Sequence, residues 1–229
     1  MSSISIFFII IGLIIGWMLL RIYGIYQISL ASKREKFIDS YQFPETITIK
    51  VIEKYPHLSK EQAELVINGL REYFYVCNIA GRSLVSMPSQ VVDIAWHEFI
   101  LFTKMYEAFC GKALNRFLHH TPAEGMSTQR KATIGIKKAW KISCYREKLS
   151  PSGSIKLPLL FALDSQLKID DGFKYTLNCT NQNNGTYCAG HINVGGGGCF
   201  SGSSGSEGWG SDDSAGADGG SSGGCGGGD

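Results

Sequence analysis

The sequence predicts a mainly α-helical protein, with an N-terminal transmembrane helix, a small helical-bundle domain and a disordered glycine-rich tail. Residues 4–20 are almost entirely apolar and carry no charged side chain, and apolar side chains then recur at helical spacing. Residues 185–229 contain 18 glycines. These observations divide the chain into an anchor with its interface (1–30), a helical domain (31–177), a Cys/His-containing loop segment (178–199) and a tail (200–229).

Charge separates the same regions of the chain. No Lys or Arg follows Lys174, whereas the last 45 residues contain five acidic side chains. The formal net charge of +2 therefore combines a tail of −5 with a remainder of +7. Because the tail is rich in Gly, Ser and Asp and has little to bury, we expect it to remain a flexible chain.

The apolar run 4–20 is the expected membrane anchor. As a helix its residues rise about 26 Å, close to the thickness of the hydrocarbon core, and Trp17 and Tyr26 suit the membrane interface. A cleaved signal peptide is the alternative. However, no basic stretch precedes the run, and residues 18–21 offer no small-residue cleavage site. We therefore expect a single-pass membrane protein.

The charges beside the span predict its orientation. The flanking basic side chains follow the apolar run and do not precede it, which places the N-terminus outside and the domain on the cytoplasmic side. These side chains are Arg21, Lys33, Arg34 and Lys36.

Gly12 and Gly16 lie four residues apart within the span. Such a pair allows two transmembrane helices to pack closely, so a homodimer through these glycines is one hypothesis. Glycine is also common in single membrane helices, which is the simpler interpretation.

The helical domain is delimited by capping residues and prolines. Ser59 with Gln62 has the spacing of a capping box, and Ser89 is the expected N-cap of the next helix. Apolar spacing predicts helices over 31–43, 45–55, 59–81, 89–111, from 127 onward and 157–163, and a strand over 173–177. The expected core contains Phe74, Trp96, Phe99, Tyr106, Trp140 and Phe161.

Asp93 and His97 are four residues apart on one predicted helix and therefore share a face. His119 and His120 follow a short connection that allows them to fold back towards His97. Imidazoles and a carboxylate are ligands for zinc or another divalent ion. The simpler alternative is a surface pair on the helix, with two histidines at the end of the following helix.

The cysteines form two groups. Cys77, Cys110 and Cys144 lie on apolar helical stripes and are expected to be buried thiols. The second group lies in a loop-rich stretch and has the ligand types of a structural zinc site: Cys179, Cys188, His191 and Cys199. Unpaired thiols and, in an oxidising compartment, disulfides are the alternatives. No motif supports a cysteine-protease centre.

Basic side chains are concentrated between Lys104 and Lys156, where eleven Lys or Arg accompany three acids. The proposed membrane-surface patch consists of Arg130, Lys131, Lys137, Lys138, Lys141 and Arg146. A solvated helix face is the ordinary meaning of such a run. In a membrane-tethered domain it would also attract anionic lipid headgroups. No nucleic-acid-binding motif accompanies the charge.

One stretch of the domain resembles a known family. Val92, Asp93, Trp96 and His97 are followed by Tyr106, Cys110 and the run His119-His120-Thr121-Pro122. This pattern resembles the helical domain of the glycine-rich domain-containing proteins, known from plants with bacterial relatives. The family often has a second histidine where this chain has Phe99, which weakens a metal site built on that position. The resemblance implies a helical fold and supplies no reaction.

Two functions from different classes are therefore expected. The first is a membrane-tethered helical interaction or scaffold module that contacts the bilayer, anionic lipid headgroups or a protein partner. The alternative is a metal-binding protein or metal-dependent enzyme that uses His97 with His119 or His120, with zinc as the possible cofactor. Neither the residues nor the resemblance identifies a substrate.

Overall fold

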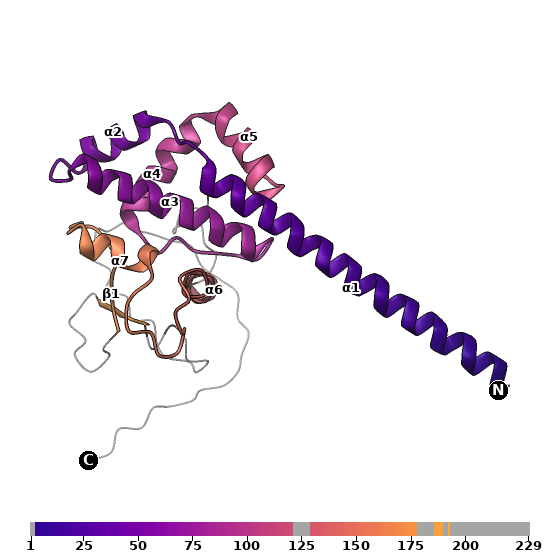
Figure 1. The fold of residues 1–229 in the computed structure, drawn as a ribbon. Coiled ribbons are helices and arrows are strands. Elements are labelled where there is room, and N and C mark those ends of the chain that lie inside the picture. Colours follow the sequence, from indigo (N-terminus) through magenta and orange to yellow (C-terminus); the bar gives the residue numbers. More distant parts are fainter. Residues whose placement is uncertain (1–2, 121–128, 178–185, 190–191, 193–229) are drawn as a thin grey trace, which may run out of the picture.

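The computed structural model describes residues 3–120, 129–177, 186–189 and 192, and the glycine-rich tail lies outside them. The described residues form a helical domain from which one long helix projects (Figure 1). A mainly α fold with a long apolar N-terminal helix is thus confirmed. The helices are α1 (Ser3–Ser40), α2 (Glu45–Lys54), α3 (Lys60–Ala80), α4 (Gln90–Leu101), α5 (Thr103–Leu114), α6 (Gln129–Arg146) and α7 (Leu159–Gln166).

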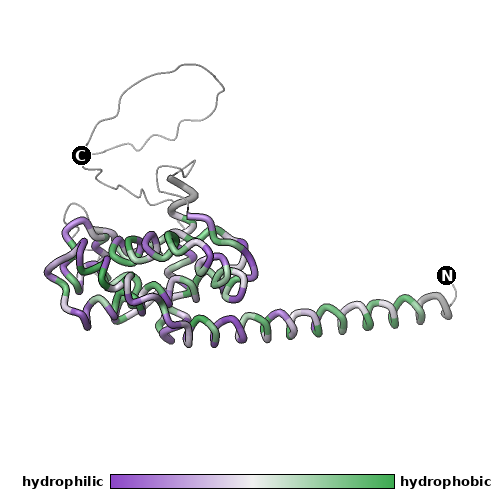
Figure 2. Tube along the Cα trace, turned by 90° about the horizontal axis from the view of Figure 1, so that it is seen from above, coloured by the Kyte–Doolittle hydropathy of each residue, from purple (hydrophilic) through white to green (hydrophobic). Residues whose placement is uncertain are grey.

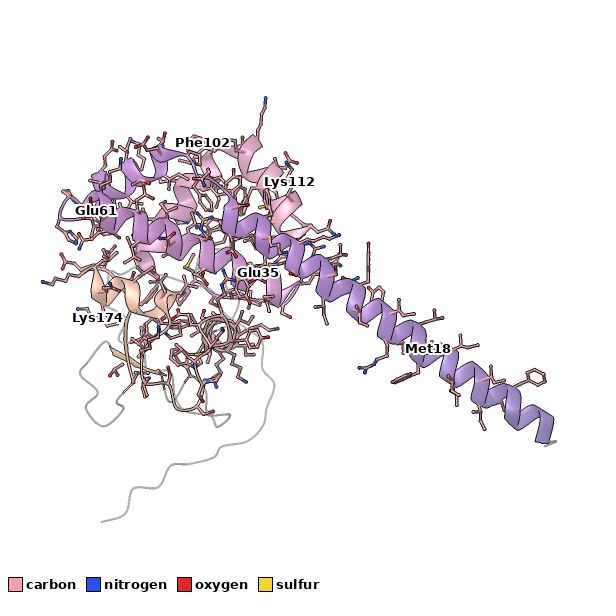
Figure 3. All side chains as sticks on the ribbon, viewed as in Figure 1. Met18, Glu35, Glu61, Phe102, Lys112 and Lys174 are labelled. Carbon is pink, nitrogen blue, oxygen red and sulfur yellow. The ribbon has the colours of Figure 1, made fainter. Side chains whose placement is uncertain are left out.

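The helix α1 has two halves with different surroundings. Its N-terminal half, which carries Met18, projects from the domain (Figure 3). The apolar side chains of this half are exposed. Hydrophobic residues prevail there, and hydrophilic ones become frequent where α1 meets the domain (Figure 2). The stretch Phe8–Ser40 is long and apolar enough to contain a membrane span. Apolar side chains with no protein around them are suited to a lipid environment.

The C-terminal half of α1 is fastened to the domain by polar contacts with its backbone. Arg71 of α3 donates to the carbonyl oxygens of Ile38 and Tyr41, at 2.6 and 2.9 Å. The Asn78 side-chain amide donates to Ala31 O at 3.1 Å. These contacts tie the C-terminal part of α1, and Tyr41 just after it, to α3. The apolar projection and the domain are consequently joined by one continuous helix.

The helix α3 lies at the centre of the domain and contacts each of the other helices. It begins at the predicted capping box, in which Ser59 and Gln62 exchange side-chain and backbone hydrogen bonds. At Gly69 the helix approaches α4 and α7 so closely that a Cβ atom would lie 2.4 Å from Leu163. It ends before Gly81, whose φ of 60° suits glycine.

The predicted helix over 89–111 is in fact two helices, which is a correction. The chain leaves helical geometry at Phe102, where ψ is 58°, and α5 begins at the next residue. Phe102 packs against the core, and the bend brings Phe109 of α5 against Phe74, with ring centroids 4.6 Å apart. Gly111 does not end the second helix, which continues to Leu114. Neither Pro nor Gly lies at the break, so core packing and not a helix-breaking residue imposes it.

A second layer of the domain is formed by α6, α7 and a small sheet. The strands β1 (Lys174–Thr176) and β2 (Thr186–Cys188) pair in parallel, with Tyr175 opposite Tyr187. Trp140 of α6 packs on Phe161 of α7, which packs on Tyr175, at centroid distances of 5.0 and 4.9 Å. The segment expected as a loop at 178–199 thus supplies β2. Buried Ala189 and Ile192 follow this strand.

Candidate metal centre

The helix α4 positions the first two residues of the site. Ser89 caps its N-terminus, since its hydroxyl accepts from the Val92 backbone N–H at 3.4 Å. Asp93 lies in the first turn, and His97 lies one turn further on the same face. His97 Nε2 is 3.7 Å from Asp93 Oδ2, so the predicted helical pair is formed.

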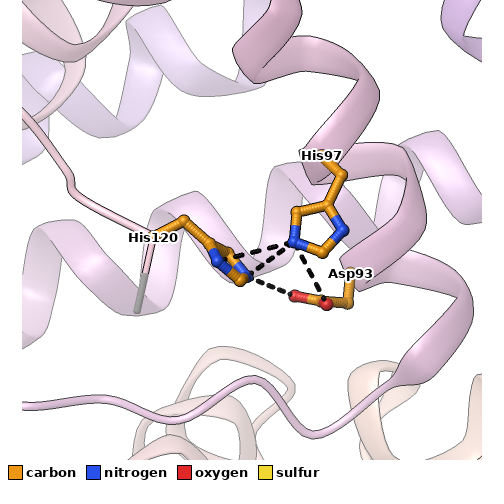
Figure 4. Close-up of side chains that lie close together, drawn as sticks. All are labelled: Asp93, His97 and His120. Atoms are coloured by element: carbon orange, nitrogen blue, oxygen red, sulfur yellow. Dashed lines mark hydrogen bonds and ion pairs between the residues drawn. The ribbon is translucent and has the colours of Figure 1, made fainter. Parts of the chain in front are cut away.

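His120 reaches the same carboxylate from the segment that follows α5. Its Nε2 lies 3.2 Å from Asp93 Oδ1 and 2.9 Å from His97 Nε2 (Figure 4). The two imidazole rings lie with their centroids 4.2 Å apart. One ligand atom from each of the three residues can be chosen such that all lie within 4.8 Å of one another.

A hydrogen-bond relay holds this segment against α4. The Trp96 indole N–H donates to Tyr106 Oη at 3.1 Å, and the Tyr106 hydroxyl donates to Leu118 O at 2.5 Å. The Trp96 ring also contacts the His120 ring edge-to-face, at 4.6 Å between centroids. Trp96 is buried, as expected of a core anchor. The core therefore fixes where His120 lies, although His120 belongs to no helix.

The three side chains differ in their access to solvent. The His97 side chain is 45% exposed, whereas Asp93 and His120 are 20% and 17% exposed. A site with one open side can admit an ion and water. Two imidazoles this close would repel each other if both were protonated, whereas a cation that binds both nitrogens and the carboxylate would favour the arrangement.

His119 does not join the cluster. Its side chain is exposed, and its ring packs on Phe117 with centroids 4.7 Å apart. Adjacent residues in an extended segment point in different directions, which separates His119 from His120. Of the two histidines proposed from the sequence, the structure brings only His120 to Asp93 and His97.

The proposed structural zinc site at Cys179, Cys188, His191 and Cys199 falls mostly outside the described residues. Cys188 is buried at the end of β2 and is disulfide-bonded. A disulfide was one of the alternatives for this group of residues. Because a disulfide sulfur is not a thiolate ligand, Cys188 does not fit the four-ligand zinc site predicted from the sequence, and the other three residues lie outside the described ranges.

The basic residues proposed as a membrane-surface patch do not share one environment. Lys141 is exposed, and Lys137 and Lys138 are half-buried on α6. The side chains of Arg130 and Lys131 lie outside the described residues. Arg146 instead forms ion pairs with Glu35 and Asp39 of α1 and Glu72 of α3. Its guanidinium also stacks on the ring of Tyr75, 4.2 Å from the ring centroid. Its charge is therefore largely compensated within the protein.

Gly12 and Gly16 lie on the projecting half of α1. An added Cβ atom at either position would meet nothing within 4 Å. With Leu13, Trp17 and Leu20 they line a shallow apolar groove along the helix. The homodimer through these glycines stays a prediction.

Sequence reasoning missed a buried carboxylate, that of Asp164 on α7. Its two oxygens accept from the Ser89 hydroxyl at 2.7 Å and from backbone N–H groups of Gln90, Val91 and Phe173 at 2.7, 3.2 and 2.8 Å. This acceptor satisfies N–H groups at the start of α4, which have no partner within the helix. Asp164 thereby holds the helix that carries Asp93 and His97.

The buried thiols have the chemistry of core residues. Burial raises the pKa of Cys77 to about 12 and that of Cys144 to about 11, and it also raises the pKa of Cys110. A nucleophilic cysteine must be a thiolate near neutral pH. These three cysteines are therefore structural, in agreement with their free and buried state.

Comparison with known proteins places the domain in a family. No curated protein and no solved structure matches the chain. One family model, UCP032817-like, matches residues 33–192, which are 160 of the 229 residues, and the family is uncharacterised. The match begins in the packed half of α1 and contains Asp93, His97 and His120. The resemblance to the glycine-rich domain-containing proteins stays a prediction. The chain belongs to the UCP032817-like family.

Proposed function

We propose that this protein is a membrane-tethered metal-binding domain that holds a divalent transition-metal ion, zinc foremost, through Asp93, His97 and His120. The observation that carries the proposal is the convergence of three ligand atoms within 4.8 Å of one another. The ligands come from two segments separated by the whole of α5, so sequence proximity alone does not explain their meeting.

The donor set defines what the site would bind. Two imidazole nitrogens and one carboxylate oxygen suit zinc, and the same set also suits non-haem iron. Three protein ligands leave at least one coordination position for water or a substrate, as in catalytic zinc sites, whereas structural zinc sites are closed by four protein ligands. The exposed side of His97 is where that position would open.

The surroundings of the site support this role. Residues that orient metal ligands raise metal affinity, because they fix the direction in which each nitrogen points. Here Trp96 contacts the His120 ring, and the relay through Tyr106 holds the backbone at Leu118. The ligands consequently need little reorganisation when they bind an ion.

Elemental analysis of the full chain tests the proposal. We would purify the chain in a non-ionic detergent, load it with zinc and dialyse away free metal. The proposal expects about one zinc per chain at this site in addition to any zinc at the cysteine-rich segment. His97→Ala should lower the content by one equivalent and leave the helical circular dichroism unchanged. Equal metal content in the two proteins would refute the proposal.

A second function, contact with an anionic membrane surface, is favoured by the position of α6. Arg146, the last residue of this helix, ties it to Glu35 and Asp39 in the packed half of α1. Exposed Lys141 lies on the same helix, five residues earlier. If the projecting half spans a membrane, α6 lies near the headgroups, where each basic side chain would contribute about 1 kcal/mol on an anionic leaflet.

Hydrogen exchange of α6 tests this second function. In nanodiscs with anionic lipid, exchange of the α6 amides should be slower than in neutral nanodiscs. Lys141→Gln should reduce the difference, and Lys50→Gln, on the distant helix α2, should not. The same exchange in both lipids would exclude the contact. The basic residues after the span favour a cytoplasmic domain, whereas the disulfide of Cys188 favours an oxidising compartment, and impermeant thiol labelling of introduced cysteines decides between the two orientations.

A further inference from the structure

A pocket of about 230 Å³ lies beside the candidate metal centre and is distinct from it. Its walls come from the loop after α3, from α3 and α4 and from the segment after α5. Trp96 separates the two sites, because it lines the pocket and also contacts His120. None of the three proposed metal ligands lines the pocket.

The charged side chains that line this pocket are basic. Arg82 and Arg116 contribute to its wall with His119, and none of the described residues that line it is acidic. Within the described part of the chain, neither arginine forms an ion pair with a carboxylate. Two uncompensated guanidinium groups beside one concave surface create a positive potential that attracts anions.

Arg116 is also held in place. Its Nε and Nη2 atoms donate to Gly81 O at 3.1 and 2.8 Å, which anchors the guanidinium to the loop after α3. Its remaining nitrogen, Nη1, makes no hydrogen bond among the described residues. A fixed guanidinium loses little conformational entropy when it binds a ligand, and its planar edge suits carboxylate and phosphate oxygens.

The rest of the wall is apolar. Leu84, Val85, Trp96, Phe117 and Leu118 line the pocket, and Ser83 and Tyr73 are the described lining residues with a neutral hydroxyl group. An inorganic anion would leave these apolar surfaces unused, whereas an organic anion would bury its hydrocarbon part against them.

We infer that this pocket binds a small organic anion, with its phosphate or carboxylate group at Arg82 and Arg116 and its apolar part against Trp96 and Phe117. Cys77 also lines the pocket, but it is buried and burial raises the pKa of its thiol, so the pocket does not present a reactive thiolate. The inference does not depend on a metal at Asp93, His97 and His120.

Calorimetric titration of the chelator-treated full chain in non-ionic detergent tests the inference. Phenylphosphonate is the probe, with benzyl alcohol as its neutral analogue and inorganic phosphate as the anion without a ring. We expect saturable binding of one phenylphosphonate per chain, weaker binding of phosphate and no saturable binding of benzyl alcohol. Metal-free protein keeps this result separate from the proposed metal function.

Two variants identify the site. Arg82→Gln, which removes an exposed side chain, and Arg116→Gln should each weaken phenylphosphonate binding about tenfold, the effect of losing one charge-assisted hydrogen bond. Lys104→Gln, an exposed basic residue outside the pocket, should leave the binding constant unchanged. Absent binding, equal binding of benzyl alcohol, phosphate binding as tight as phenylphosphonate, or an unaffected Arg82→Gln variant would each overturn the inference.

Discussion

Asp164 and Asp93 both place a carboxylate beside the first turn of α4, but their oxygens have different partners. Asp164 is 2% exposed and accepts from three backbone N–H groups and the Ser89 hydroxyl. The Asp93 side chain is 20% exposed and faces two imidazole rings. The start of α4 thus lies beside two carboxylates. Fixed donors enclose that of Asp164, whereas that of Asp93 lies beside groups that can themselves bind a metal.

The difference separates a structural carboxylate from a candidate ligand. Backbone N–H groups have fixed directions, and an ion at Asp164 would have to displace those of Gln90, Val91 and Phe173. Imidazole nitrogens can exchange a proton for a metal ion while the rings stay in place. Loss of Asp164 should therefore affect folding, and loss of Asp93 should affect binding.

Asp164→Ala should cause the largest loss of stability. The substitution leaves the four donors around this position without an acceptor in a buried environment, at a cost of about 3 kcal/mol or more. Denaturant unfolding of the full chain in detergent, followed by circular dichroism, measures the loss. Exposed Asp170 provides the control, and Asp170→Ala should change the free energy of unfolding by less than about 0.5 kcal/mol. A similar small change for Asp164→Ala would show that the donors find other partners.

Tyr106→Phe should have a smaller effect that reaches both regions. It keeps the ring in the core but removes the hydroxyl that joins Trp96 to Leu118, and such a lost hydrogen bond costs about 1 kcal/mol. Because the relay holds the segment that carries His120, zinc affinity should fall about tenfold. Denaturant unfolding measures the loss of stability of this variant, and competition with a chelator measures its zinc affinity. Unchanged zinc affinity would show that the relay does not position His120.

Asp93→Asn should have the smallest effect on stability. An acidic side chain in the first turn of a helix stabilises it by about 0.5 kcal/mol, so the metal-free variant should lose no more than that. Thermal unfolding of chelator-treated protein measures this loss. The stabilisation that added zinc gives the native chain should, in contrast, disappear in Asp93→Asn. A loss comparable to that of Asp164→Ala would make Asp93 a second structural carboxylate.

Local sequence rules predicted the parts of the site that one helix contains. The N-caps Ser59 and Ser89, and the one-turn spacing of Asp93 and His97, follow from neighbours within four residues. The choice between His119 and His120 could not be made, because both lie in an irregular segment whose direction depends on Tyr106 and Leu118. The partnership between Asp164 and Ser89 joins positions 75 residues apart, which no local spacing indicates.

The same limit explains the errors in the fold. The break at Phe102 contains neither Pro nor Gly, and the periodicity of 89–111 continues through it. Packing of Phe109 on Phe74 selects two helices over one, and this contact depends on the whole core. The strand β2 was missed because three residues in a polar stretch give no periodic signal. Its partner strand, in contrast, shows alternation over 173–177.

The central claim, that Asp93, His97 and His120 form one metal site, is tested most directly by comparing two adjacent histidines. Zinc affinity of the full chain would be measured by competition with a chromophoric chelator for the native protein, His120→Ala and His119→Ala. The account predicts that His120→Ala weakens zinc binding at this site at least about a hundredfold, whereas His119→Ala leaves it unchanged. Equal zinc affinities in the two variants would contradict it.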